Sequence, residues 1–209
     1  ILMEKVCVIG LGYIGLPTAA IIANKGIKVI GFDINENLLS SINKGEVSEE
    51  EPNLKKLVKK VLNNQNLVTS NCLKKADVYI IAVPTPLKKS NTNEPSADME
   101  YVYGVAKEIA NIIEPGNMVI IESTSSIGTT NKVAELIEKY SKISKNKFDF
   151  VCCPERVIPG NIMYEIINND RIVGGLNGKS SKRGAKFYSY FCEGKIYQTT
   201  SETAELAKL

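Results

Sequence analysis

The stretch KVCVIGLGYIG, Lys5 to Gly15, determines the fold. Its first half is a short apolar, β-branched run that predicts a buried strand over residues 5–9. Three glycines follow in the spacing GxGxxG, and they open a helix predicted over residues 13–25. Gly10 permits the tight turn, Gly12 lets the backbone approach a pyrophosphate, and Gly15 lets helix and strand pack closely. The stretch therefore predicts a dinucleotide-binding turn, with a helix N-terminus that favours the anion.

An acid at the end of the second predicted strand, residues 28–32, completes this pattern. Asp33 lies 18 residues after Gly15, where it can accept hydrogen bonds from an adenosine ribose. The alternative is a purely structural glycine turn, followed by an Asp that caps the next helix. The strand–turn–helix context, the spacing of the glycines and the position of the acid together disfavour this alternative. FAD and S-adenosylmethionine sites share parts of the pattern and stay open on these residues. Asp33 would repel a 2′-phosphate and Ile34 and Asn35 supply no cation, so NAD is favoured over NADP.

Strands and helices alternate along the rest of the chain. Most strands are continuously apolar, which predicts a parallel sheet covered by helices on both faces. The fold class is therefore a Rossmann-type, doubly wound α/β fold with a mostly parallel sheet. The further predicted strands are 67–69, 77–83, 118–121, 148–152, 171–173 and 196–198, the helices are 35–43, 52–63, 99–113, 128–140 and 180–191, and a polar loop covers 87–96.

Composition narrows the function classes. Hydrophobic residues make up 44% and charged residues 23% of the 209 residues, as in a soluble globular protein. The net charge of +3 is too balanced for a nucleic-acid footprint, and no apolar run is long enough for a membrane span or a signal peptide. The five cysteines form no CxxC, which favours reduced thiols in the cytoplasm.

The chain has no histidine. Ser-His and Cys-His pairs and histidine metal sites are therefore excluded within it, and we predict no metal. Proton transfer must use Glu, Asp, Lys, Tyr, Cys or water.

Polar residues follow three predicted strands. Thr85 lies in Val83-Pro84-Thr85-Pro86, Thr124 in Glu122-Ser123-Thr124-Ser125, and Glu155 in the run VCCPERVIPG, residues 151–160. Open α/β sheets bind ligands at the carboxyl ends of their strands, so we expect these three residues near the nicotinamide end of a dinucleotide. For Glu155 the alternative is a surface carboxylate paired with Arg156.

The two thiols beside Glu155 are weaker candidates. Cys152 and Cys153 are adjacent at a strand end, so their side chains point to opposite faces. Neither has a cation fixed beside it, and free cysteine is usually buried packing. We expect both to pack, together with Cys7 and Cys192.

Taken together, the motifs resemble the N-terminal part of the UDP-glucose/GDP-mannose dehydrogenases over about Met3 to Leu209. The matching runs are VIGLGYIGLP, VPTP, ESTSSIGTT, CPERVIPG and TAELAKL. PERVxPG followed by NDRIVGG most resembles the branch that acts on UDP-N-acetyl-D-mannosamine. The UDP-glucose branch has a second acid where this chain has Pro159, although UDP-glucose or another UDP-hexose stays the alternative substrate.

The resemblance implies a four-electron oxidation. A sugar C6 alcohol becomes a carboxylate, two NAD+ are reduced, and a cysteine forms a thioester that water hydrolyses. Thr124 and Glu155 match positions that hold or activate the water, and Lys208 matches a lysine proposed to stabilise the oxyanion. Without the resemblance, Lys208 would be interpreted as a solvated helix residue. The cofactor-binding candidates are Gly10, Gly12, Tyr13, Ile14, Gly15, Asp33, Val83, Pro84, Thr85, Thr124 and Glu155.

The resemblance also sets the expected domain organisation. Thr199-Thr200-Ser201-Glu202 is typical of a capping box that opens a helix. We expect an NAD-binding domain over 3–199 and the start of a truncated connecting helix over 200–209, without the C-terminal UDP-sugar domain. The family's cysteine lies in a GGxC-type motif that these residues lack, so the chain alone is expected to be inactive. The full-length protein is expected to be a homodimer that takes a UDP-sugar, with no nucleic-acid or membrane partner.

A function of another class is a non-catalytic module that senses NAD. It needs only the glycine turn and Asp33. It gives no reason for the polar groups at Thr85, Thr124 and Glu155.

Overall fold

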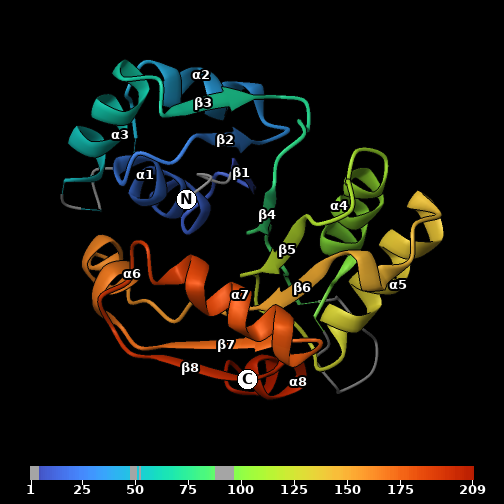
Figure 1. Cartoon of the computed structure of the whole chain (residues 1–209). Coiled ribbons are helices and arrows are strands. Elements are labelled where there is room, and N and C mark those ends of the chain that lie inside the picture. The colour runs from blue at the N-terminus through green and yellow to red at the C-terminus, as the bar shows by residue number, and fades with distance from the viewer. Residues whose placement is uncertain (1–4, 48–50, 52, 88–96) are drawn as a thin grey trace.

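Eight strands form one sheet in the computed structural model, which describes residues 5–47, 51, 53–87 and 97–209 (Figure 1). Their order across the sheet is β3-β2-β1-β4-β5-β6-β7-β8. The order reverses between β1 and β4, and such a switch point is where open α/β sheets bind ligands. The strands are β1 (Val6–Ile9), β2 (Val29–Phe32), β3 (Leu67–Ser70), β4 (Val78–Ile81), β5 (Met118–Ile121), β6 (Asp149–Cys152), β7 (Arg171–Gly175) and β8 (Ile196–Thr200).

Helices cover both faces of the sheet, as Figure 1 shows. Alternate residues of each strand face opposite layers, so Val6 and Val8 pack with one set of helices while Cys7 and Ile9 pack with the other. Helices α1 (Gly15–Asn24), α2 (Glu36–Asn43), α3 (Leu54–Asn63), α6 (Ile162–Asn168) and α7 (Gly178–Tyr188) contribute to the first layer. Helices α4 (Glu100–Ala110) and α5 (Thr129–Ser141) form the second. This double burial explains the continuously apolar strands and confirms the predicted fold class.

One pair of neighbouring strands runs in opposite directions. The pairing of β6 with β7 is antiparallel, with Cys152 opposite Gly174, while β7 and β8 are parallel to each other. Continuing the β6–β7 register by three residues brings Glu155 opposite Arg171. The starts of β7 and β8 therefore lie at the sheet edge where β1 to β6 end.

Helix α6 was not predicted from the sequence. Its N-cap residue, Asn161, makes no side-chain cap bond. The buried carboxylate of Glu51 instead accepts hydrogen bonds from the Gly160 N–H (2.7 Å) and the Ile162 N–H (3.0 Å). Because the cap comes from a residue more than 100 positions away, the local sequence carries no signal for this helix.

The last helix differs in detail from the prediction. Helix α8 (Ser201–Leu206) is capped by Thr200, whose hydroxyl accepts from the Thr203 N–H (3.3 Å), one residue later than the predicted capping box. The predicted loop over 87–96 lies outside the described residues from position 88 onward, as does the predicted helix start at position 52. Among the helices of the described residues, none is long and apolar enough to cross a membrane.

A buried acid ties α8 to α5. Glu205 is fully buried, and its carboxylate accepts from the Gly128 N–H (2.6 Å), the Thr130 N–H (2.7 Å) and the Thr130 hydroxyl (2.6 Å). A carboxylate at a helix N-terminus satisfies unpaired N–H groups and interacts favourably with the helix dipole. Glu205 therefore fixes the position of α8, and with it that of Lys208.

We expect Glu205→Gln to destabilise the protein by roughly 2–4 kcal/mol, because an amide NH2 would face the Gly128 N–H without an acceptor. Chemical denaturation measures the loss. Glu202→Gln on the exposed side of the same helix is the matched control, with an expected change within about 0.5 kcal/mol. Equal effects of the two substitutions would contradict the capping role.

Candidate cofactor and catalytic site

Two glycines of the turn between β1 and α1 are required by the packing of the backbone, whether or not a ligand is bound. Gly10 has φ +91°, and a Cβ there would lie 2.8 Å from the Ala82 carbonyl oxygen. A Cβ on Gly15 would lie 1.8 Å from the Gly10 carbonyl oxygen. Neither position can carry a side chain unless the backbone moves, because real Cβ contacts are not this short.

Gly12 is different, because a Cβ added there would meet no protein atom within 4 Å. In the part of the chain that the structure describes, the backbone N–H groups of Gly12 and Ile14 donate no hydrogen bond. Open space, free N–H groups and a helix N-terminus are what a pyrophosphate requires. The turn therefore fits the diphosphate of a dinucleotide.

Asp33, which follows β2, is hydrogen-bonded to the backbone of the same turn. Its carboxylate accepts from the Leu11 N–H (2.8 Å) and the Asn35 N–H (2.9 Å), one bond to each oxygen. An ionised carboxylate has about four acceptor sites, so Asp33 retains capacity for the hydroxyls of a ribose. Ile34 beside it is 79% exposed.

A cavity of about 430 Å³ lies at the carboxyl ends of β1, β4, β5 and β6. It contains nine of the predicted site residues, whereas Gly10, Gly15 and Asp33 do not line it. Five lining residues were not predicted as site residues, although four of them, Glu122, Ser123, Val157 and Pro159, lie in the runs singled out in the sequence. The lining is Gly12, Tyr13, Ile14, Ala82, Val83, Pro84, Thr85, Glu122, Ser123, Thr124, Glu155, Val157, Pro159 and Lys208.

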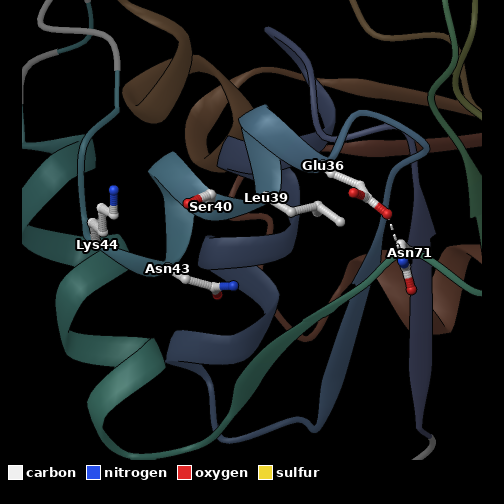
Figure 2. Close-up of a pocket in the computed structure, with 6 residues that line it drawn as sticks. All are labelled: Glu36, Leu39, Ser40, Asn43, Lys44 and Asn71. Carbon is white, nitrogen blue, oxygen red and sulfur yellow. Dashed lines mark hydrogen bonds between the residues drawn. The ribbon is translucent and has the colours of Figure 1, made fainter.

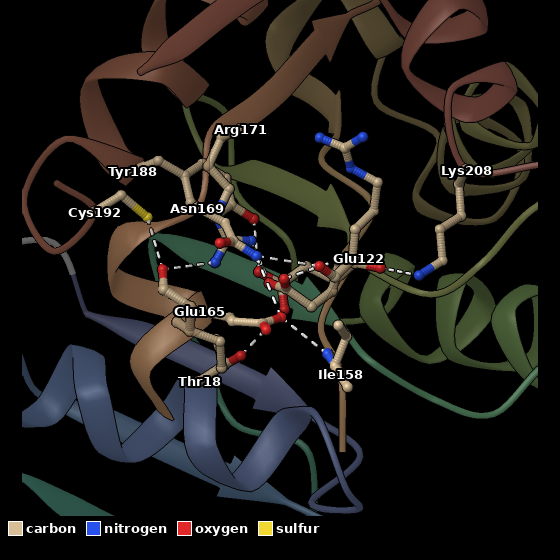
Figure 3. Close-up of polar contacts among 12 residues, drawn as sticks. Thr18, Glu122, Ile158, Glu165, Asn169, Arg171, Tyr188, Cys192 and Lys208 are labelled. Carbon is tan, nitrogen blue, oxygen red and sulfur yellow. Dashed lines mark hydrogen bonds and ion pairs between the residues drawn. The ribbon is translucent and has the colours of Figure 1, made fainter. Parts of the chain in front are cut away.

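The three candidate catalytic residues line the same cavity. Thr124 is exposed to it, and the Nζ of Lys208 donates to the backbone carbonyl of Glu155 (Figure 3). Burial lowers the pKa of Lys208, while the negative charge of Glu155 opposes that shift. Ser123 donates to the Val83 carbonyl (2.7 Å) and so joins the ends of β4 and β5.

Glu155 is not the surface carboxylate of the alternative interpretation. It is 5% exposed and forms an ion pair with Arg171, which is 3% exposed. Its contact with Arg156 is only a bond accepted from that residue's backbone N–H (3.0 Å). The antiparallel start of β7 places Arg171 opposite Glu155. The sequence did not predict this partner. The available signal was the single charged residue at the start of the apolar run RIVGG.

A second buried acid, Glu122, lies beside this ion pair (Figure 3). It accepts hydrogen bonds from the Tyr188 hydroxyl (2.7 Å) and the Thr18 hydroxyl (3.5 Å). Burial, followed by the negative charge of Glu155, raises the pKa of Glu122 to about 7. The sequence placed Glu122 at the end of a strand but did not single it out.

The thiols near the site are packed into the protein. Cys152 and Cys153 are both fully buried, and burial raises the pKa of Cys153 to about 12 and that of Cys152 well above its usual range. Cys7 and Cys192 are buried as well, and Cys72 is exposed. Because the thiolate is the nucleophile, the buried thiols are inert at neutral pH.

A separate depression of about 470 Å³ lies between α2 and the end of β3 (Figure 2). Asn71 donates to the Glu36 carboxylate across it (3.1 Å). Its lining contains none of the predicted site residues and is Glu36, Leu39, Ser40, Asn43, Lys44 and Asn71.

The sheet order, the glycine turn and the strand-end acid define a dinucleotide-binding domain. Residues 4–192 match the family model described as the NAD binding domain of the UDP-glucose/GDP-mannose dehydrogenase family. The chain belongs to this family, and its cofactor is NAD.

Several UDP-N-acetyl-D-mannosamine dehydrogenases are similar to the chain. The protein from Methanococcus maripaludis (strain C7) is 44% identical over 99% of the chain and 47% of its own length. That from Campylobacter jejuni is 46% identical over 99% of the chain and 52% of its own length. A structure of the Staphylococcus aureus enzyme has TM-score 0.92 at 37% identity and covers 98% of the chain and 50% of its own. The chain thus spans about half the length of the curated relatives it matches.

The glycine geometry separates binding from folding. We expect Gly12→Ala to keep the stability of the protein but weaken NAD binding about tenfold or more, because the new methyl group occupies the approach to the turn. Gly15→Ala should lower stability by about 1–3 kcal/mol or more, because its Cβ clashes with backbone. Thermal unfolding and calorimetric NAD titration test both. If the Gly12→Ala variant folds and its affinity for NAD is unchanged, the turn does not bind the diphosphate as proposed.

For Asp33 we expect tighter binding of NAD+ than of NADP+, because its carboxylate repels a 2′-phosphate. Asp33→Ala should weaken NAD+ binding and narrow that preference. Parallel titrations of both cofactors measure the two effects. Equal or tighter NADP+ binding by the unmodified protein would refute this role, as would an unchanged NAD+ affinity in the variant.

Proposed function

We propose that this chain is the NAD-binding part of a nucleotide-sugar 6-dehydrogenase that oxidises the C6 alcohol of UDP-N-acetyl-D-mannosamine to the uronate with two NAD+. The observation that carries this proposal is a single cavity with the glycine turn on one side and Thr124, Glu155 and Lys208 on the other. The curated relatives that match nearly the whole of this chain are named for that substrate. In this proposal residues 3–199 are the NAD-binding domain and residues 200–209 begin the connection to a second domain.

Each side chain of the cavity has a proposed role that its surroundings support. NAD accepts a hydride when bound, and Gly12 and Ile14 would hold its diphosphate. The ion pair with Arg171 favours the ionised form of Glu155, and each carboxylate oxygen retains an acceptor site. Glu155 can therefore take a proton from a water held with the Thr124 hydroxyl. The ammonium group of Lys208 lies beside them and would stabilise a developing oxyanion.

The nucleophile in this proposal is a cysteine outside these 209 residues. No cysteine is among the residues that line the described cavity, and the thiols nearest to it are buried. We infer that the chain alone binds NAD but performs no net oxidation of the sugar, because no thiol lines the cavity that the structure describes.

A non-catalytic NAD sensor is the other class of function. It would use the turn and Asp33 alone. The placement of Thr124, Glu155 and Lys208 on the cofactor cavity favours the enzyme.

In the complete protein that contains this chain, we expect two NADH per UDP-N-acetyl-D-mannosamine. Glu155→Gln should slow turnover about 10²–10⁴-fold, because it keeps the shape of the side chain and removes its acid–base capacity. Hydrolysis should be affected more than NAD binding, so a covalent intermediate should accumulate in rapid-quench samples.

UDP-glucose and UDP-N-acetylglucosamine are the comparison substrates, and thermal unfolding of the variant is the control for folding. Faster oxidation of UDP-glucose would replace the proposed substrate. Normal turnover of Glu155→Gln would remove Glu155 from the mechanism, and a complete protein that oxidises no UDP-sugar would favour the sensor.

A further inference from the structure

Two buried carboxylates line the cofactor cavity. Glu122 and Glu155 both line the cavity, and both are at most 5% exposed. They follow neighbouring strands, and the Glu155 N–H approaches the Glu122 carbonyl oxygen at 3.5 Å. In the part of the chain that the structure describes, Arg171 is the one cation that forms an ion pair with either carboxylate. Two buried carboxylates therefore depend on one guanidinium (Figure 3).

Such an arrangement is costly when both acids are ionised. An uncompensated buried charge loses its hydration, and a second like charge nearby adds repulsion, so one of the two groups binds a proton instead. Carboxylate pairs of this kind titrate as a unit, with one proton held well above the usual pKa range of an acid.

The contacts distinguish the two acids. Glu155 has a guanidinium and a backbone N–H, which can only donate and so favour the ionised form. The partners of Glu122 are the hydroxyls of Tyr188 and Thr18, which are neutral and can either donate or accept. Glu122 can therefore take up a proton without losing its partners.

The other titratable groups around Glu122 leave this balance unchanged. Burial raises the pKa of Tyr188 well above its usual value, so its hydroxyl stays protonated. The thiols of Cys153 and Cys192 stay protonated near neutral pH for the same reason. Lys208 lines the cavity and donates to the backbone carbonyl of Glu155 rather than to either carboxylate.

We propose that Glu122 holds a proton around neutral pH, while Glu155 stays paired with Arg171. Glu122 is then a positioning residue: it acts through Glu155, which it keeps ionised as the base. This role depends on the proposed function of Glu155, whereas the location of the proton does not. As the pH rises through about 7, Glu122 loses the proton and the cavity gains a second negative charge.

Carboxyl-carbon NMR of protein labelled at glutamate Cδ tests the location of the proton. We expect one glutamate signal with a midpoint near pH 7, far from the ordinary glutamate range near pH 4 to 5. Glu122→Gln should remove it. Glu36→Gln, on the depression in Figure 2, is the matched control and should leave it in place.

Two further substitutions should move the same signal in opposite directions. Glu155→Gln removes the like charge and releases Arg171 toward Glu122, so the midpoint should fall by about one pH unit or more. Tyr188→Phe removes a donor to the ionised carboxylate, so the midpoint should rise. These variants also keep the test decisive if Glu122→Gln does not fold.

A signal near pH 7 that survives Glu122→Gln and disappears in Glu155→Gln would place the proton on Glu155 and overturn the proposal. So would the absence of any such signal in folded protein. The expected titration in a protein that binds no NAD would refute the proposed function and leave the proton assignment in place.

Discussion

The buried ion pair between Glu155 and Arg171 is the constraint on which the cavity edge of the sheet depends. A buried carboxylate needs a partner, and a buried ion pair adds little net stability because both groups lose their hydration. Its effect is on geometry. Glu155 follows β6, and the neighbouring strand β7 starts at the same edge with a cation opposite it. The antiparallel direction of β7 produces this arrangement, in a sheet whose strands from β3 to β6 are all parallel.

Local signals in the sequence were sufficient for the sheet and the cofactor turn. Continuous apolar runs predicted the strands, and GxGxxG with Asp33 predicted the turn and its ligand class. Thr85, Thr124 and Glu155 line one cavity because the ends of parallel strands share one edge, and their roles there stay predictions. Lys208 could be selected only through the family resemblance, because nothing near it in the sequence distinguishes it from a solvated lysine.

What the sequence could not reveal are the partners that come from far along the chain. Arg171 depends on the direction of one strand, and the role of Glu122 depends on Tyr188 and Thr18, which lie on helices at opposite ends of the sequence. Helix α6 depends on a cap from Glu51. In each case a charged or polar group is buried because a distant residue completes its hydrogen bonds. The hydrophobic periodicity of strands and helices, 2 and 3.6 residues, carries no information about such a contact.

Glu51 also links the cofactor cavity to the stability of the fold. Its carboxylate contacts Gly160 and Ile162, 109 and 111 residues further along the chain, and accepts a bond from the Tyr13 hydroxyl, 38 residues before it. Closing loops of this length costs chain entropy. These bonds hold together segments that carry Tyr13 and Pro159, and both of these residues line the cavity. A dinucleotide that recognises this wall binds the folded protein and not the unfolded chain, so bound cofactor adds to the stability of the fold.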